Sequence, residues 1–195
     1  MPLEPLPLPG AEVAFDPAWL PGDAADALFD ALVGTVPWEV HRIRLFGRTV
    51  DSPRLSCWIG DPGAAYTYSG TRFVPRPWPA PLVPVRERLR RELGVDFNSA
   101  LANLYRDGRD AMGWHADAEA ELGPAPVIAS LSLGATRRFA LKARDDPARK
   151  RVLDLPAGAL LVMSGQTQRR YRHALPRTAR PVGPRINLTF RRVLA

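Results

Sequence analysis

The chain has little of what would mark a secreted or membrane protein. Cys57 is the only cysteine among 195 residues, so no disulfide can form within the chain, and we expect a reducing compartment. No apolar run approaches the roughly 20 residues that a membrane-spanning helix needs. The start, residues 1–9, is broken by prolines and has no basic region of a secretory signal. These absences predict a cytoplasmic protein.

Lysine is nearly as scarce as cysteine, yet the chain is strongly basic. The formal net charge is +7, and 25 of the 27 basic residues are arginine, the others being Lys142 and Lys150. The arginine preference is typical of a GC-rich, bacterial genome, but such a bias does not explain the excess of positive charge. That excess favours a polyanionic partner such as nucleic acid.

The apolar pattern changes near residue 97. Before it, residues 23–33 and 81–93 have helical spacing; Asp23 caps the first helix, which turns Leu28, Leu32 and Val33 inward, and Gly94 ends the second. After it come short apolar runs separated by glycine and proline, at residues 99–105, 127–133, 138–141, 152–155, 160–163 and 186–193. Many short strands with such turns indicate a jelly roll or barrel.

These patterns divide one catalytic domain into three parts. We expect an extended, proline-rich arm at residues 1–22, helices and a lid of hairpins at 23–96, and a β core at 97–195. One predicted hairpin lies at residues 43–48, where apolar and basic residues alternate around an exposed aromatic tip, Phe46-Gly47.

Two of the three histidines fall into one metal-ligand pattern. His115 and Asp117 are two residues apart, so in a strand both side chains point the same way, and His173 can reach them from a later strand. Two imidazoles and one carboxylate are the facial triad that holds iron(II) and leaves positions open for oxygen chemistry. A His-x-Asp pair alone is usually structural, and the same ligand types also bind catalytic zinc.

A strand predicted at residues 185–191 distinguishes these alternatives. Its alternation puts Arg185, Asn187, Thr189 and Arg191 on one face. Two guanidiniums beside a metal suit a small dicarboxylate, because each offers a planar fork and keeps its charge. A zinc hydrolase has no need of such a ligand, whereas an iron oxygenase needs an electron donor. The pattern therefore favours iron(II) with 2-oxoglutarate.

Two polar residues of an earlier strand also face one way. Asn103 and Tyr105 precede the metal pair by ten to twelve residues. An amide and a phenol there are suited to complete the hydrogen bonding of the co-substrate. Taken alone, Asn103 is more readily explained as a structural residue.

Together these residues make the chain resemble the AlkB family of nucleic-acid dealkylating dioxygenases, and most of all members like the human DNA-repair homologues. Coverage runs from about residue 40 to the end. The motifs that carry the resemblance are Asn-Leu-Tyr-Arg-Asp-Gly (103–108), Gly-Trp-His-Ala-Asp-Ala-Glu (113–119), Ile-Ala-Ser-Leu-Ser-Leu-Gly-Ala (128–135), Gly-Ala-Leu-Leu-Val-Met (158–163), Tyr-Arg-His-Ala-Leu-Pro (171–176) and Pro-Arg-Ile-Asn-Leu-Thr-Phe-Arg (184–191).

The resemblance implies an α+β, mostly β fold: a double-stranded β-helix, or jelly roll, buttressed by N-terminal helices and covered by a nucleotide-recognition lid. It implies iron(II) at His115, Asp117 and His173. The residues that it implies for 2-oxoglutarate are Asn103, Tyr105, Arg185, Asn187, Thr189 and Arg191. In the family's reaction, O2 and 2-oxoglutarate give succinate, carbon dioxide and a ferryl species that hydroxylates the N-alkyl carbon, after which an aldehyde leaves.

The same resemblance implies a set of substrate contacts. The residues are Phe46, Gly47, Arg54, Tyr66, Tyr68 and Glu119. The tyrosines would stack on a flipped base, the Phe-Gly tip would fill the gap that the base leaves, and the glutamate would bond an exocyclic amine. Arg54 falls where relatives touch the nucleic-acid backbone or the opposite strand. Burial of Phe46 in the protein and a solvated Glu119 are the plainer alternatives for those two residues.

We therefore expect a monomeric iron(II) and 2-oxoglutarate dioxygenase that repairs 1-methyladenine and 3-methylcytosine in alkylated DNA. RNA or tRNA modification is the alternative within the class. A nucleic-acid-binding protein of the same fold without turnover is the alternative outside it, although such a protein would not need a complete triad. Ala118 departs from relatives that carry a second acidic residue there, so any substrate contact of that side chain is missing.

Overall fold

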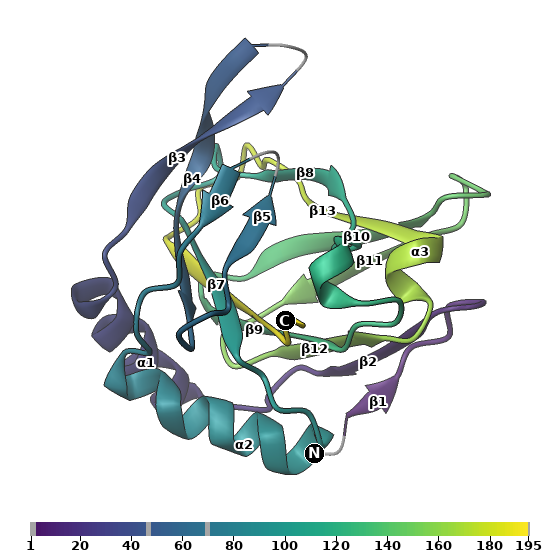
Figure 1. Cartoon of the computed structure of the whole chain (residues 1–195). Coiled ribbons are helices and arrows are strands. Elements are labelled where there is room, and N and C mark those ends of the chain that lie inside the picture. The colour runs from purple at the N-terminus through teal and green to yellow at the C-terminus, as the bar shows by residue number, and fades with distance from the viewer. Residues whose placement is uncertain (1–2, 46–47, 69–70, 195) are drawn as a thin grey trace.

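Two antiparallel sheets form the framework of the described chain. The computed structural model describes residues 3–45, 48–68 and 71–194. Its larger sheet has eight strands, in the spatial order β1 (Glu4–Pro5), β2 (Glu12–Asp16), β12 (Leu160–Ser164), β9 (Ile128–Gly134), β14 (Arg185–Arg191), β7 (Ser99–Tyr105), β4 (Arg48–Gly60) and β3 (Glu39–Leu45). Its smaller sheet has four, β11 (Lys150–Leu155), β10 (Arg137–Ala143), β13 (Tyr171–Leu175) and β8 (Met112–His115). The arrangement confirms the predicted jelly roll (Figure 1).

Central strands of the larger sheet are buried on both faces, because alternate side chains enter different cores. In β12, Leu160 and Val162 belong to a core beneath the helices. Leu161 and Met163, from the same strand, join a second core with side chains of the smaller sheet. Every second side chain of these strands therefore points into the space between the two sheets.

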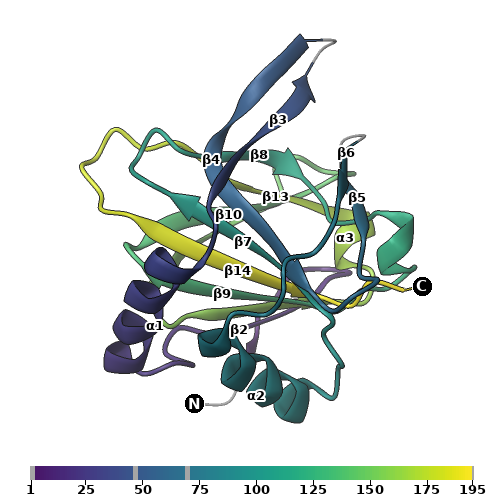
Figure 2. The same cartoon turned by 60° about the vertical axis from the view of Figure 1, so that its left-hand side comes forward.

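Two helices cover the outer face of the larger sheet, as predicted (Figures 1 and 2). α1 spans Gly22–Thr35, and α2 spans Val83–Leu93 after a 3-10 turn, η1, at Ala80–Leu82. The buried positions of α1 are Ala25, Leu28 and Leu32. The sequence pattern predicts Val33 on this side as well, but Val33 is 44% exposed, because it lies off the stripe that the helical spacing of the other three residues defines.

Gly94 ends α2 as the sequence predicted. Its φ of 66° is in the left-handed region, and its N–H donates to the carbonyl of Arg90. Glycine adopts this conformation without the cost that a Cβ would add, which is why it commonly ends helices. No helix among the described residues is long and apolar enough to span a membrane.

Two hairpins stand on the same side of the molecule (Figures 1 and 2). One is formed by β3 and β4, and it extends past the sheets at the top of Figure 1. The other is formed by β5 (Tyr66–Tyr68) and β6 (Thr71–Phe73). Both hairpins fall within residues 23–96, the range in which the sequence predicts a lid, and a role in nucleotide recognition stays a prediction. The predicted wedge, Phe46 with Gly47, lies outside the described residues.

The N-terminal segment is part of the framework. The sequence predicts an extended arm at residues 1–22, but two strands of this segment lie in the larger sheet, and β2 pairs with β12 from Asp16↔Leu160 to Glu12↔Ser164. The Tyr171 hydroxyl donates to the carbonyl of Pro9 at 3.0 Å. This segment therefore adds an edge to the larger sheet and closes one side of the inner core.

Candidate metal and co-substrate site

Two side chains from neighbouring strands and one from the residues just after a strand meet between the sheets. His115 ends β8, Asp117 follows it by two residues, and His173 lies in β13, directly opposite His115 in the register of the smaller sheet. One ligand atom from each lies within 4.8 Å of the others. The imidazole centroids are 4.2 Å apart, and His115 Nε2 is 3.8 Å from Asp117 Oδ1. The two histidines and the carboxylate thus form one group, the arrangement that a facial triad requires.

Neighbouring groups fix the orientation of these ligands. His115 Nδ1 donates to the carbonyl of Gly113 at 2.8 Å, which leaves the Nε2 lone pair free for a metal. The N–H of Asp117 donates to Oε1 of Gln168 at 3.0 Å, and Gln168 Nε2 donates to the sulfur of Met163. Gln168 is a buried residue of α3 (Thr167–Arg170) that sequence reasoning missed, since a lone glutamine gives no motif.

Protonation in this group suits metal binding. Burial lowers the pKa of His173 to about 3 and also lowers the pKa of His115. Both imidazoles are therefore neutral near pH 7. Burial by itself would raise the pKa of Asp117, but the Arg191 guanidinium holds that pKa below its usual range. Two neutral imidazoles and one carboxylate are the forms that bind a cation.

The two arginines of β14 have different partners. Arg191 Nη2 donates to Asp117 Oδ2 at 2.8 Å, so it is committed to the carboxylate. Arg185 is 2% exposed, and its Nη2 donates to Ser132 Oγ at 2.9 Å. Its Nε and Nη1 are buried without a hydrogen-bond partner among the described residues. Burial lowers the pKa of Arg185 to about 10.

A buried guanidinium with two unpaired donors is costly unless an anion joins it. Arg185 lines the same pocket as the three ligand residues, so a carboxylate in this pocket would pair with donors that are already in place. A dicarboxylate such as 2-oxoglutarate fits this requirement. The unpaired Nε and Nη1 of Arg185 are thus the reason why this pocket suits 2-oxoglutarate.

Asn187 and Thr189 have internal partners. Asn187 Nδ2 donates to Ser130 Oγ and to the carbonyl of Leu131, at 2.8 and 3.1 Å, and its Oδ1 accepts from Thr189 Oγ1. The amide has no donor left for a ligand. The structure therefore makes Asn187 a support of the pocket wall, although sequence reasoning expected it to bind 2-oxoglutarate directly.

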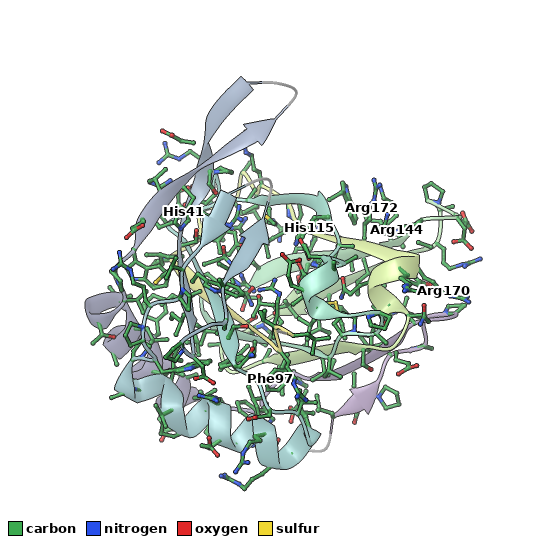
Figure 3. The ribbon with its side chains drawn as sticks, viewed as in Figure 1. His41, Phe97, His115, Arg144, Arg170 and Arg172 are labelled. Atoms are coloured by element: carbon green, nitrogen blue, oxygen red, sulfur yellow. The ribbon has the colours of Figure 1, made fainter. Side chains whose placement is uncertain are left out.

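All nine residues that the sequence predicted for metal and co-substrate line one pocket between the sheets. They are His115, Asp117 and His173 for the metal, and Asn103, Tyr105, Arg185, Asn187, Thr189 and Arg191 for the co-substrate. The pocket also has an apolar wall, made by Leu101, Met112, Phe139, Met163 and Leu175. The third histidine, His41, lies in β3 of the longer hairpin, and Figure 3 labels it apart from His115.

Two of the predicted substrate residues, Arg54 and Glu119, are not among the described residues that line this pocket. Tyr66 and Tyr68 are in β5 of the shorter hairpin. Glu119 precedes the 3-10 turn η2 (Ala120–Leu122) and borders a neighbouring hollow with Gln168. Arg54 is 6% exposed and bonds Asn103. This burial does not fit a direct contact with a phosphate on the surface.

Arg137, a second residue that sequence reasoning missed, ties the loops around the site together. Arg137 is 3% exposed, and its guanidinium donates to three backbone carbonyls, those of Asp107, Asp110 and Pro176. Two of these carbonyls lie in the loop that leads to β8, and the third follows β13. The strands that carry the metal ligands are thus held at one end by one side chain. Nothing in the sequence indicates this role beyond an inward position in β10.

Known proteins similar to the chain point to one family. The model of the 2OG-Fe(II) oxygenase superfamily matches residues 12–191. DNA oxidative demethylase ALKBH2 of Arabidopsis thaliana is 38% identical, the alignment covering 95% of this chain and 67% of that protein. Human ALKBH2 is 39% identical over 87% of this chain and 69% of that protein. Alpha-ketoglutarate-dependent dioxygenase alkB homolog 3 of Bos taurus is 36% identical over 94% and 66%, respectively.

The chain spans about two thirds of the length of these curated relatives. A solved structure, that of OsALKBH1, superposes with a TM-score of 0.62, covering 98% of this chain and 100% of that one at 17% identity. At that identity the likeness concerns the fold, and it agrees with the jelly roll described above.

Proposed function

Because the chain belongs to the AlkB branch of the 2OG-Fe(II) oxygenase superfamily, whose cofactors are iron(II), 2-oxoglutarate and O2, we propose that it removes alkyl groups oxidatively from nucleobase nitrogens in DNA. The proposed substrates are 1-methyladenine and 3-methylcytosine. One observation carries the proposal: the predicted metal and co-substrate residues line one pocket, in which two Arg185 donors are unpaired.

We assign the metal to His115, Asp117 and His173. Iron bound there supplies the oxidation of the N-alkyl carbon with O2 and 2-oxoglutarate. The protein supplies neutral imidazoles, an ionised carboxylate and Arg191, which holds that carboxylate in place. A fixed ligand geometry of this kind costs no rearrangement when the substrate arrives.

The co-substrate is assigned to the polar side of the pocket. The unpaired Nε and Nη1 of Arg185 would bind one carboxylate of 2-oxoglutarate. Asn103 and Tyr105 would bond its other oxygen atoms, and Thr189 would line its path. The apolar wall opposite them, which includes Met112 and Phe139, would keep bulk water from the reacting carbon.

The proposed substrate follows from two features, the access of an alkylated base to the pocket and the positive charge of the surface. A methyl group on a base-pairing nitrogen cannot enter this pocket while its base is stacked, so the base must be flipped or single-stranded. Tyr66 and Tyr68 would stack on that base, Glu119 would bond its exocyclic amine, and Phe46 with Gly47 would fill the gap in the duplex. Exposed arginines, among them Arg144, Arg170 and Arg172 in Figure 3, would attract the polyanion.

The test is mass spectrometry of an oligonucleotide that carries one 1-methyladenine. Single-stranded and paired DNA, and RNA of the same sequence, are incubated with the protein, iron(II), ascorbate and 2-oxoglutarate. Asp117→Ala is the inactive control. We expect the DNA to lose the mass of one methylene group only when 2-oxoglutarate is present and Asp117 is intact.

The other outcomes separate the alternatives. Loss of the methylene from RNA but not from DNA would replace the proposed substrate with RNA. Succinate formation without demethylation of any oligonucleotide would contradict both substrates while leaving the cofactors in place. The absence of both products would favour a nucleic-acid-binding protein without turnover.

A further inference from the structure

Arg54 is a buried arginine on the strand that leads out of the longer hairpin. β4 alternates, so Cys57 and Ile59 enter the core beneath the helices, whereas Arg54 and Ser56 face the inside of the jelly roll. Ser56 pairs with Asn103 of β7, and Arg54 is on the same face two residues away. The side chain therefore lies beside the co-substrate residues of β7.

Arg54 makes a direct bond to one of these residues. Its Nε donates to Oδ1 of Asn103 at 2.7 Å, and the two residues are 6% and 5% exposed. A bond from a guanidinium is stronger than one between neutral groups, and burial strengthens it further. No described carboxylate lies within ion-pairing distance of Arg54. Among the described residues, Asn103 is therefore the hydrogen-bond partner that orients this guanidinium.

The bond also decides which way the Asn103 amide faces. A guanidinium has only donors, so the amide must present its oxygen to Arg54. The two N–H donors of Nδ2 are then the atoms left for a second partner. Asn103 lines the pocket in which two Arg185 donors are unpaired. A rotated amide would bring an acceptor toward an anionic ligand and would repel it.

We propose that Arg54 is a positioning residue for 2-oxoglutarate, acting by holding Asn103 with its N–H donors toward the co-substrate. This inference rests on the proposed assignment of 2-oxoglutarate to the pocket. It differs from the role in nucleic-acid contact that the resemblance implies for Arg54, because the buried guanidinium acts on the co-substrate and makes no contact with a phosphate.

Binding measurements on the metal-loaded protein test the proposal without turnover. Manganese(II) replaces iron(II), and calorimetry gives the dissociation constant of 2-oxoglutarate. Fluorescence anisotropy gives that of a methylated single-stranded oligonucleotide. The variants are Arg54→Gln, Arg54→Lys, Asn103→Ala and the double variant Arg54→Gln with Asn103→Ala. Arg76→Gln is the matched control, since Arg76 lies near the same strand and is exposed at its pair with Glu39.

We expect Arg54→Gln to weaken 2-oxoglutarate binding roughly ten- to a hundredfold, the effect of losing a bond to a charged group. DNA affinity should stay close to that of Arg76→Gln. The double variant should bind 2-oxoglutarate no more weakly than Asn103→Ala, because Arg54 acts through Asn103. Arg54→Lys keeps the charge but not the planar donor, and an intermediate affinity is expected. If Arg54→Gln does not fold, Arg54→Lys tests the proposal instead: its affinity for 2-oxoglutarate should fall while its affinity for the oligonucleotide stays unchanged.

Unchanged 2-oxoglutarate affinity in the Arg54 variants would overturn the proposal, and a selective loss of DNA affinity would restore the nucleic-acid contact. Additive losses in the double variant would show that Arg54 does not act through Asn103. A failure of the proposed function would give a different result from a failure of this inference. The wild-type protein would then bind 2-oxoglutarate with the expected dependence on Arg54 and still leave methylated DNA unchanged.

Discussion

Arg191 Nη2 lies 2.8 Å from Oδ2 of Asp117, and both side chains are buried. Arg191 of β14 thus places a cation beside the carboxylate of the metal group. Arg185, on the same face of β14, places unpaired donors in the co-substrate pocket. Metal site and co-substrate site are therefore coupled through a single strand. Changes on that strand should affect both.

Arg191→Gln should destabilise the protein and weaken its metal site. Removing one partner of a buried ion pair leaves the other charge unpaired, which typically costs about 3–5 kcal/mol. Urea unfolding of the metal-free protein measures this free energy. Arg138→Gln is the control, because the Arg138–Asp154 pair is 4.0 Å apart and exposed, and such pairs contribute about 0–1 kcal/mol. Equal losses in the two variants would contradict the structural role of Arg191.

Arg185→Met should abolish binding of 2-oxoglutarate without lowering the stability of the protein. The guanidinium of Arg185 is buried with two unpaired donors, so an apolar side chain of similar length should leave the free energy of unfolding unchanged or raise it. Binding of 2-oxoglutarate should be lost. Urea unfolding and calorimetry on the same preparation check both. A large loss of stability would show that Arg185 is needed for folding without any ligand.

The metal-free protein should lose stability as the pH falls below about 6.5, the ordinary pKa of a histidine. In the folded chain the pKa of His173 is lowered from 6.5 to about 3. Between these pH values the unfolded state binds more protons than the folded state, so acid favours unfolding. The free energy of unfolding should fall by up to about 1.4 kcal/mol per pH unit for each such histidine. The lowered pKa of His115 acts in the same direction.

Urea unfolding in the presence of a chelator, from about pH 7.5 to about pH 4.5, measures this dependence on pH across the window in which a histidine titrates. His173→Gln should show a smaller slope than the wild-type protein. Equal slopes would mean that the acid sensitivity arises elsewhere in the chain.

Phe46→Ala should lower demethylation of duplex DNA more than that of single strands, because a wedge is needed only where a stack must be filled. Val74→Ala is the control, since Val74 is an exposed apolar residue, 73% accessible, next to the other hairpin. Initial rates on both substrates from one preparation give the ratio. The wedge hypothesis fails if the two rates fall equally.

Much of the site could be predicted from the sequence because its residues alternate along strands, so that every second side chain lies on the same face. Arg185 to Arg191 on one face, and Asn103 with Tyr105 on another, follow from alternation alone. The strand predicted at residues 99–105 matches β7 (Ser99–Tyr105). Strands were expected around His115 and His173, but the sequence predicted no bounds for β8 and β13, since β8 has only four residues and the apolar pattern of β13 is interrupted by Arg172 and His173.

By itself, the sequence determined the residue types, their faces and the jelly roll, since these depend on local period and on motifs. Tertiary structure alone decided which polar atoms are already paired. Asn187 is satisfied by Ser130, whereas the donors of Arg185 remain unpaired, and no local pattern distinguishes the two residues. It also decided that Arg54 is buried beside Asn103, because that contact joins residues 49 positions apart through strand register.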